Sequence, residues 1–130
     1  MYISNFMITI NQLIKGLRKK KIKKSRVKQL CRCPQKRGVC LKVYTIAPKK
    51  PNSAVRKLAK IRIKSTNKNI LANIPGQGHN LQEYSVVLIR GGRVRDMPGI
   101  RFRLIRGVYD FSNKESFIRK NKRSKHGISK

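Results

Sequence analysis

The chain has 130 residues, of which 34 are Lys or Arg and only four are acidic, so its formal net charge at pH 7 is +30. Such a charge repels itself unless a polyanion neutralises it, and an RNA or DNA backbone does so while releasing condensed counterions. A membrane surface fits less well, because it favours a basic amphipathic helix with large apolar anchors, and the chain has no Trp and four Phe. The length allows one small domain with polar extensions.

The apolar run at the start, residues 1–14, predicts neither a signal peptide nor a membrane span. It is too short to cross a bilayer, lacks a basic beginning and is interrupted by Asn5, Asn11 and Gln12. The first basic residue is Lys15, which also argues against an organelle transit peptide.

A short helix and a basic arm are predicted next. Thr9 and Gln12 are spaced as in a capping box, and apolar residues follow at helical intervals, which predicts an amphipathic helix from Thr9 to Leu17. Its apolar face should dock on a partner. From Arg18 to Lys28 the chain is dominated by Lys and Arg and cannot form a core, so we expect it to be extended or disordered until its charge is neutralised.

Three cysteines, Cys31, Cys33 and Cys40, form a C-x-C-x6-C pattern without a secretory signal, so reduced thiols are expected. A metal site would need a fourth ligand, and His79 or His126 could supply it only by folding together from far along the chain. The spacing matches no standard zinc pattern. We therefore favour buried or RNA-facing thiols, and we expect no metal and no other cofactor.

Five short strands are predicted between residues 39 and 104. In the first, Val39, Leu41 and Val43 alternate with Cys40, Lys42 and Tyr44, and in the second one face is apolar and the other wholly cationic. The expected strands cover residues 39–44, 59–64, 70–74, 85–89 and 100–104, separated by turns of Asn, Gly and Pro.

Such strands and turns are what a closed barrel of the oligonucleotide-binding type needs, because closure removes exposed edges. We therefore predict a mainly β protein with a five-stranded oligonucleotide-binding-type β-barrel. The long basic N-terminal arm with its short helix is expected to occupy residues 1–30, the barrel residues 31–110, and a basic C-terminal tail residues 111–130.

The loop between the first two strands has the sequence PKKPNSAVRK, residues 48–57, with four cations and no acid. Pro51 fixes its own φ and disfavours a helical conformation at Lys50, so the loop should project stiffly. Asn52 and Ser53 offer short donors and acceptors suited to a groove edge or a ribose hydroxyl, and the flanking cations suit phosphates. An ordinary basic surface turn is the alternative, since turns are rich in Pro, Asn and Ser.

Four sequence blocks, in order, resemble the signature of one family. They are CPQKRGVC at 33–40, PKKPNSA at 48–54, GHNLQE at 78–83 and RGGRVRDMPG at 90–99. By these blocks the chain is similar, over nearly its whole length, to the small-subunit ribosomal protein family called "twelve". Short stretches of the sequence are most like those of mitochondrial members, so we expect a mitochondrial location, with plastid and bacterial cytoplasm as alternatives.

The resemblance implies a structural constituent of the small ribosomal subunit that binds rRNA at the decoding centre and supports the accuracy of aminoacyl-tRNA selection. The implied partners are small-subunit rRNA, the codon–anticodon helix of mRNA and tRNA, and neighbouring small-subunit ribosomal proteins, with no membrane and no homo-oligomer. In the family, positions matching Pro51 and Ser53 contact the minor groove of the codon–anticodon helix, whose 2′-hydroxyls report pairing geometry. The position of Arg95 is commonly Lys, which leaves the family's drug response open for this chain.

The expected contacts form three groups. The decoding-loop contacts are Lys49, Lys50, Pro51, Asn52 and Ser53. The second loop near the decoding centre contributes Arg93, Arg95, Asp96, Pro98 and Gly99. The cations expected on rRNA phosphates are Arg18, Lys19, Lys20, Lys21, Lys23, Lys24, Arg26, Arg56, Lys57, Lys60, Arg62, Arg101 and Arg103.

No catalytic residue is assigned. Asp96, flanked by arginines, is expected to be a carboxylate satisfied by those neighbours, and His79 and Glu83 are expected to be structural hydrogen-bonding groups instead of an acid/base pair. Two other functions compete with the ribosomal one. A free RNA-binding or RNA-chaperone protein should expose stacking aromatics on its strands, and a thiol or metal enzyme would need a further ligand or base beside its cysteines.

Overall fold

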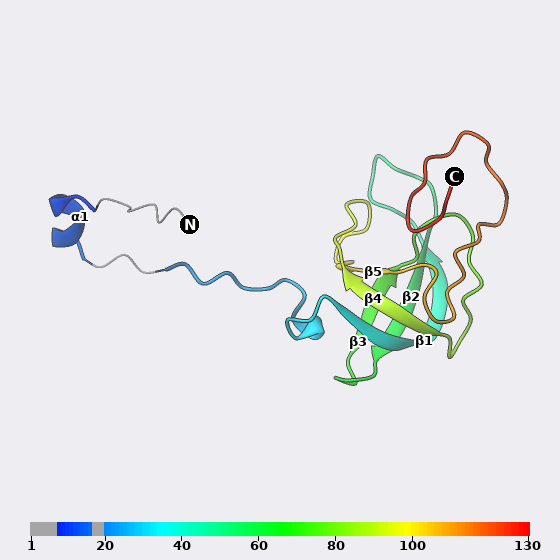
Figure 1. Ribbon diagram of the computed structural model, residues 1–130, viewed down its shortest axis with the longest axis horizontal. Helices are drawn as coiled ribbons and strands as arrows, with labels where there is room; N and C mark the ends of the chain where they lie inside the picture. The colour runs from blue at the N-terminus through cyan, green and yellow to red at the C-terminus, as the bar shows by residue number, and fades with distance from the viewer. Residues whose placement is uncertain (1–7, 17–19) are drawn as a thin grey trace.

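The computed structural model describes residues 8–16 and 20–130, and its main feature is a closed five-stranded β-barrel (Figure 1). The strands are β1 (Gln35–Ile46), β2 (Arg56–Ile63), β3 (Asn69–Asn73), β4 (Val86–Gly91) and β5 (Phe102–Leu104). Their order around the barrel is β1-β2-β3-β5-β4, and β4 pairs with β1 to close it. Neighbours are antiparallel except β3 and β5, which are parallel. The predicted mainly β barrel of five strands is confirmed.

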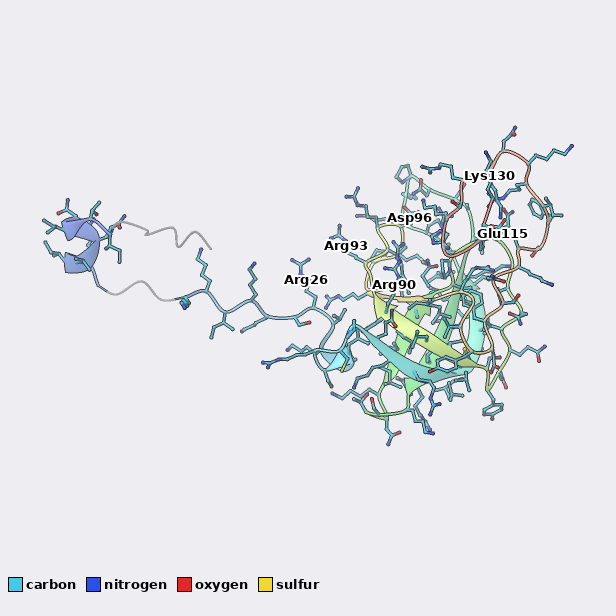
Figure 2. All side chains as sticks on the ribbon, viewed as in Figure 1. Arg26, Arg90, Arg93, Asp96, Glu115 and Lys130 are labelled. Atoms are coloured by element: carbon cyan, nitrogen blue, oxygen red, sulfur yellow. The ribbon has the colours of Figure 1, made fainter. Side chains whose placement is uncertain are left out.

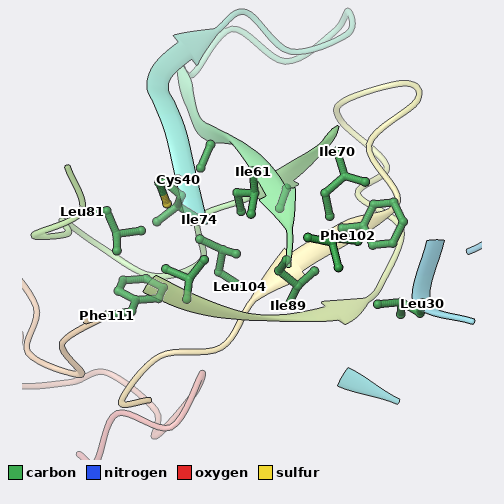
Figure 3. Packing of buried hydrophobic residues seen from close by; sticks show 14 residues of the cluster. Leu30, Cys40, Ile61, Ile70, Ile74, Leu81, Ile89, Phe102, Leu104 and Phe111 are labelled. Carbon is green, nitrogen blue, oxygen red and sulfur yellow. The ribbon is translucent and has the colours of Figure 1, made fainter. Parts of the chain in front are cut away.

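β2 shows how the alternating sequence builds the barrel wall. Ile61 and Ile63 are fully buried, whereas Lys60 and Arg62 beside them are exposed. Each fully buried isoleucine contributes about 1.5–3 kcal/mol relative to an exposed one, so the strand is stable only with this face inward. The other strands, η1 and the segments between and after the strands supply the rest of the core, in which Figure 3 labels Leu30, Cys40, Ile70, Ile74, Leu81, Ile89, Phe102, Leu104 and Phe111.

β1 is longer than predicted, and an irregularity changes which of its residues face the core. Its pairing with β2 shifts register between Cys40 and Lys42, as at a β-bulge. Before the shift Cys40 is fully buried, and after it Val43 packs against the core. The expected strict alternation of Val39, Leu41 and Val43 on one face is therefore wrong, because an extra residue in one strand reverses the parity of those that follow.

The predicted N-terminal helix is present but shorter. In α1 (Ile10–Ile14) the Thr9 hydroxyl accepts a hydrogen bond from the Gln12 backbone N–H, and the Gln12 side chain accepts one from the Thr9 N–H, which confirms the capping box. The expected extension beyond Ile14 is wrong, because Gly16 has φ +109 and leaves helical space. Leu17 lies outside the described residues. No residue of α1 is buried, so its docking on a partner stays a prediction.

The basic arm joins the barrel earlier than expected. Residues 20–26, which we call the arm, are exposed and lack regular secondary structure, and in Figure 1 they lead away from the barrel. Val27 already packs against the core, and Leu30, at the end of the 3₁₀ turn η1 (Lys28–Leu30), is buried in it. The arm therefore ends before Lys28. The division of the chain at residues 30 and 110 stays a prediction.

Candidate nucleic-acid interface

Two loops meet at one end of the barrel, and Asp96 joins them. The first loop is residues 47–55, and the second loop is residues 92–101. The Lys49 backbone N–H donates to the Asp96 carbonyl oxygen at 2.7 Å, and Asn52 Nδ2 donates to its carboxylate Oδ1 at 2.7 Å. Arg56 Nη2, where β2 begins, pairs with Oδ2 at 2.8 Å. Asp96 of the second loop thus contacts the first loop through Lys49 and Asn52, and it contacts β2 through Arg56.

The partners of Asp96 differ from those expected. The carboxylate was expected to be satisfied by the flanking Arg93, Arg95 and Arg101, but Asn52 and Arg56 satisfy it instead. Arg93 and Arg95 are exposed, and Arg101 Nη1 donates to the carbonyl oxygen of Arg26 at 3.3 Å. The actual partners lie 44 and 40 residues away in the sequence, and the fold brings them together.

A small apolar cluster supports the two loops from below. Leu58 of β2 and Met97 and Ile100 of the second loop are buried together, with Tyr44 and Val94 packed against them. This cluster is distinct from the main barrel core. Because it draws on the strands before and after the first loop, it fixes the base of both loops to the barrel.

The tip of the first loop is exposed. Every residue from Lys49 to Ser53 is accessible to solvent, and the Lys50–Pro51 peptide bond is cis. The Asn52 backbone N–H donates to the Lys49 carbonyl at 3.1 Å, which closes a tight turn. Within the described part of the chain, the Ser53 hydroxyl has no hydrogen-bond partner, so it can meet an external group.

The second loop also presents exposed residues, and a strand holds it in place. Arg93, Arg95, Pro98 and Gly99 are exposed, and Figure 2 shows Arg93 and Asp96 at the same end of the molecule. Arg103 of β5 donates from Nη2 to the Arg93 carbonyl oxygen at 2.9 Å. This arginine, expected on an rRNA phosphate, is thus half-buried and engaged within the protein.

The other cations expected on phosphates divide by location. Arg56 is half-buried in its ion pair with Asp96. Lys57, Lys60, Arg62 and Arg101 are exposed on or beside the barrel, and the arm exposes Lys20, Lys21, Lys23, Lys24 and Arg26. Arg18 and Lys19 lie outside the described residues. The structure therefore places the accessible members of this expected set on three surfaces: the arm, the outer face of β2 and the loops.

Arg106 is a residue that the sequence reasoning missed, since nothing distinguished it among 34 cations. It is only 5% exposed, and its guanidinium donates to four backbone carbonyl groups. The acceptors are the carbonyl oxygens of Pro75 at 2.7 Å, of Ser112 and Lys114 at 3.2 Å each, and of Gly78. Its guanidinium carbon lies 4.6 Å from the centre of the Phe111 ring. Burial lowers the pKa of Arg106 from its ordinary value, while Glu115 acts in the opposite direction.

Arg106 holds the start of the C-terminal tail, residues 111–130, on the barrel, and Glu115 pairs with cations within the tail. Phe111 and Ile128 are buried in this arrangement. The Glu115 carboxylate accepts hydrogen bonds from Arg119 Nη2 at 2.8 Å and Lys122 Nζ at 3.1 Å. The hydrogen bond from Lys122 is the main reason that the pKa of Glu115 is lowered. The tail is therefore packed on the barrel, whereas the arm is exposed along its whole length.

A cleft of about 970 Å³ lies between the tail and the barrel. Its walls come from the start of β2, the turn at residues 74–79, the second loop, β5 and the tail. They carry seven Lys or Arg residues and two carboxylates, Asp96 and Glu115. Both histidines of the chain, His79 and His126, also line it. Sequence reasoning did not identify this cleft, because no motif marks it.

His79 has a structural hydrogen bond, as predicted: its Nδ1 accepts from the Leu81 backbone N–H at 3.2 Å. Burial, with Lys57 and Arg106 nearby, lowers the pKa of His79. Glu83 is exposed and does not pair with this histidine. The arrangement therefore contains no acid/base pair at these two positions.

The cysteines occupy two environments. Cys40 is fully buried, and burial followed by the charge of Asp110 raises the pKa of its thiol to about 11. Cys31 and Cys33 are exposed free thiols. Among residues 8–16 and 20–130, no cluster of three or more His, Cys, Asp or Glu side chains could hold a metal ion. In the same part of the chain, no helix is both long and apolar enough to cross a membrane.

Among the residues that the structure describes, the aromatic side chains that are more than half exposed lie in turns and in the tail. Tyr84, Tyr109 and Phe117 are more than half exposed, and none of them belongs to a strand. A free RNA-binding barrel was expected to carry stacking aromatics on its strands. This arrangement does not favour that alternative.

Comparison with known proteins gives two findings. The chain matches the family described as Ribosomal protein S12/S23 over residues 23–126. A relative from Acanthamoeba castellanii, named Small ribosomal subunit protein uS12m, is 59% identical over 123 residues, which are 95% of this chain and 96% of the relative. The family match includes both loops, the whole barrel and the residues that line the cleft.

Proposed function

This chain belongs to the Ribosomal protein S12/S23 family, and from that membership we propose that it supports accurate selection of aminoacyl-tRNA at the decoding centre of the small ribosomal subunit. The protein is a structural component of the small subunit and not an enzyme, as the sequence predicted. The relative's name, which ends in m, is that of a mitochondrial protein, and the predicted mitochondrial location is confirmed.

The observation that carries the proposal is the pairing of an exposed tip with a fixed base. Pro51 and Ser53 stand in solvent, while three contacts to Asp96 hold Asn52 between them and the chain before and after them. An A-form minor groove displays 2′-hydroxyls whose positions depend on pairing geometry. A short hydroxyl on a loop that is already ordered can test that geometry with little loss of entropy on binding.

The cations around the tip suit phosphate anchoring. Lys49 and Lys50 are exposed beside it, and Arg93 and Arg95 are exposed on the second loop. The guanidinium group of Arg95 is planar and positively charged, and it can donate two parallel hydrogen bonds to a phosphate. In this proposal the codon–anticodon helix meets the first loop, and rRNA meets the second loop, the outer face of β2 and the arm.

Asp96 and Asn52 have positioning roles in the proposal. Nδ2 of Asn52 is occupied by the Asp96 carboxylate, so this amide group orients the loop instead of donating to RNA. Arg56 likewise neutralises Asp96 and is less available to a phosphate than Lys57, which is exposed.

The test is the variant Ser53→Ala, expressed in place of the parent chain in organellar ribosomes. Removing one hydroxyl that hydrogen-bonds to the groove should change the binding free energy by about 1 kcal/mol, or roughly fivefold in near-cognate misincorporation. The amount of assembled small subunit should be normal, because the side chain supports nothing in the fold. The measurements are the misincorporation rate and the yield of subunits.

Two matched variants complete this test. Ser124→Ala removes an exposed hydroxyl from the tail and should change neither quantity. Ile61→Ala removes a buried side chain from the barrel, should cost about 2–5 kcal/mol of folding stability, and should lower the yield of subunits. The proposal fails if Ser53→Ala abolishes assembly, or if it leaves both measurements at the parent values.

A further inference from the structure

We infer that the cleft between the barrel and the tail is a binding site for the phosphodiester backbone of an RNA strand. The identity of the ligand as RNA rests on the proposed function, but the site is separate from the tip of the first loop. Its tail residues lie outside the decoding loops and outside the set of cations expected on phosphates. Three of them, Arg123, Lys125 and His126, carry the argument.

The cleft has an excess of unpaired positive charge. Its two carboxylates are already matched, Asp96 by Arg56 and Glu115 by Arg119 and Lys122. Within the described residues, Lys57, Arg123 and Lys125 on its walls have no carboxylate partner. Like charges facing one another across a cleft raise its affinity for an anion.

The walls of the cleft are held in place by hydrogen bonds and buried side chains. Arg106 ties the turn before residue 79 to the start of the tail through its four hydrogen bonds. Gly76, with φ +84, leaves space for it, because a Cβ there would lie 2.6 Å from Arg106 Nε. Further along, Ile128 is buried and closes the tail against the barrel. The cations are therefore held in place before any ligand arrives, which reduces the entropy lost on binding.

The two histidines report on the charge inside the cleft. Burial lowers the pKa of His126, and Lys125, Arg103, Arg106 and Arg90 lower it further. His79 is affected in the same way by burial, Lys57 and Arg106. A phosphate close to either ring would favour its protonated form and raise its pKa. Binding in the cleft should thus take up protons and become tighter as pH falls toward 6.

The lining favours RNA over an acidic protein segment. Protein partners require a core of apolar and aromatic contacts, whereas nucleic-acid interfaces are polar and strongly positive. Charged and polar side chains make up most of the lining, and among the described residues that line the cleft no aromatic residue other than histidine is found. An acidic peptide is the competing occupant that the experiment must exclude.

The experiment is an NMR titration of the histidine rings in the full chain, with and without a short oligouridylate, at about 0.1 M salt. The sequence has only two histidines, and both line the cleft, so every histidine signal reports on the cleft. At this ionic strength charges farther than about 10 Å are largely screened. RNA in the cleft should raise the pKa of both rings, by on the order of half a pH unit.

Two double variants, each of which removes two positive charges, show whether the rise in histidine pKa comes from RNA in the cleft. Arg123→Gln with Lys125→Gln removes cations from the cleft, and the rise caused by RNA should disappear. Lys114→Gln with Lys120→Gln removes exposed cations of the same tail that do not line the cleft, and the rise should persist. The inference is overturned if RNA leaves both histidines unchanged, or if the rise survives in the cleft variant.

A hexaglutamate peptide serves as the second probe. A rise as large as that with RNA would overturn the assignment to a phosphodiester strand. Little or no rise would support it. The decoding proposal is judged separately, since Ser53→Ala is measured in assembled subunits and does not involve the cleft.

Discussion

The arm and the tail are both basic, but they have opposite structures. Lys and Arg are five of the seven arm residues and seven of the twenty tail residues, and both segments were expected to be basic extensions of the barrel. The arm exposes every residue from 20 to 26, and Figure 2 shows Arg26 beside a segment that leads away from the barrel. The tail returns to the barrel, where Figure 2 shows Glu115 and Lys130.

The tail has a few anchors and a lower density of charge, and both account for the difference. The tail has Phe111 and Ile128 to bury, Glu115 to pair with its own cations, and carbonyl groups that accept from Arg106. The arm has no acid and only Ile22 as an apolar side chain, which is exposed. A basic segment can therefore be ordered without RNA when the barrel offers it a buried anchor, and otherwise its order must come from the ligand.

Removing the largest anchor should have the largest effect. Phe111→Ala empties a site that is 1% exposed, and we expect a loss of about 3–5 kcal/mol in the free energy of unfolding. Phe117→Ala, at a position 53% exposed on the same tail, should change it by less than about 0.5 kcal/mol. Urea unfolding of the two full-length variants measures both values. Equal losses would show that the tail is not anchored through Phe111.

Arg106→Gln should have the next largest effect and should act mainly on the tail. It removes donors from four carbonyl groups, and leaving buried acceptors unpaired costs about 1–3 kcal/mol. Brief trypsin digestion should cleave the tail faster in this variant, while cleavage in the arm keeps its parent rate. Arg101→Gln, which removes an exposed arginine with one backbone contact, is the control. Faster cleavage in the arm as well would mean that Arg106 supports the whole barrel.

The smallest of the expected effects is the loss of stability at acid pH, which should arise from the cleft and the tail and not from the arm. The lowered pKa values of His79 and His126 mean that the fold favours the neutral rings, so stability is complete above their ordinary value of 6.5 and is lost as pH falls below it. The contribution of Glu115, whose pKa is lowered, persists until pH falls below 4.5. Between pH 7.5 and 5.5 the urea midpoint should therefore decrease slightly, and His126→Gln should reduce this dependence. An unchanged midpoint in the parent chain would contradict the expectation.

The sequence predicted those features that local patterns determine. The two faces of β2 between Ala59 and Ile63 follow from alternation, and the Thr9 capping box follows from a spacing of three residues. The end of the helix was missed, although Gly16 marks it, because the apolar spacing continued to Leu17.

What could not be predicted depends on contacts between distant segments. The register shift after Cys40 arises from pairing with β2, and a periodic pattern in one strand cannot show it. The partners of Asp96 lie about forty residues away, so its flanking arginines were the wrong choice. Arg106 had no local signal, because its role depends on carbonyl groups that only the finished fold gathers.

Closure of the barrel also sets the order in which the RNA-binding surfaces can form while the chain is being synthesised. β1 cannot complete its hydrogen bonds until β4 has been made, with Gln35 opposite Arg90, and β5 must then join β3 to β4. The arm and the first loop are synthesised before β4 and β5, because they precede them in the chain, whereas the cleft needs residues up to His126. A nascent chain therefore offers its arm to RNA first and its cleft last, after the barrel has folded.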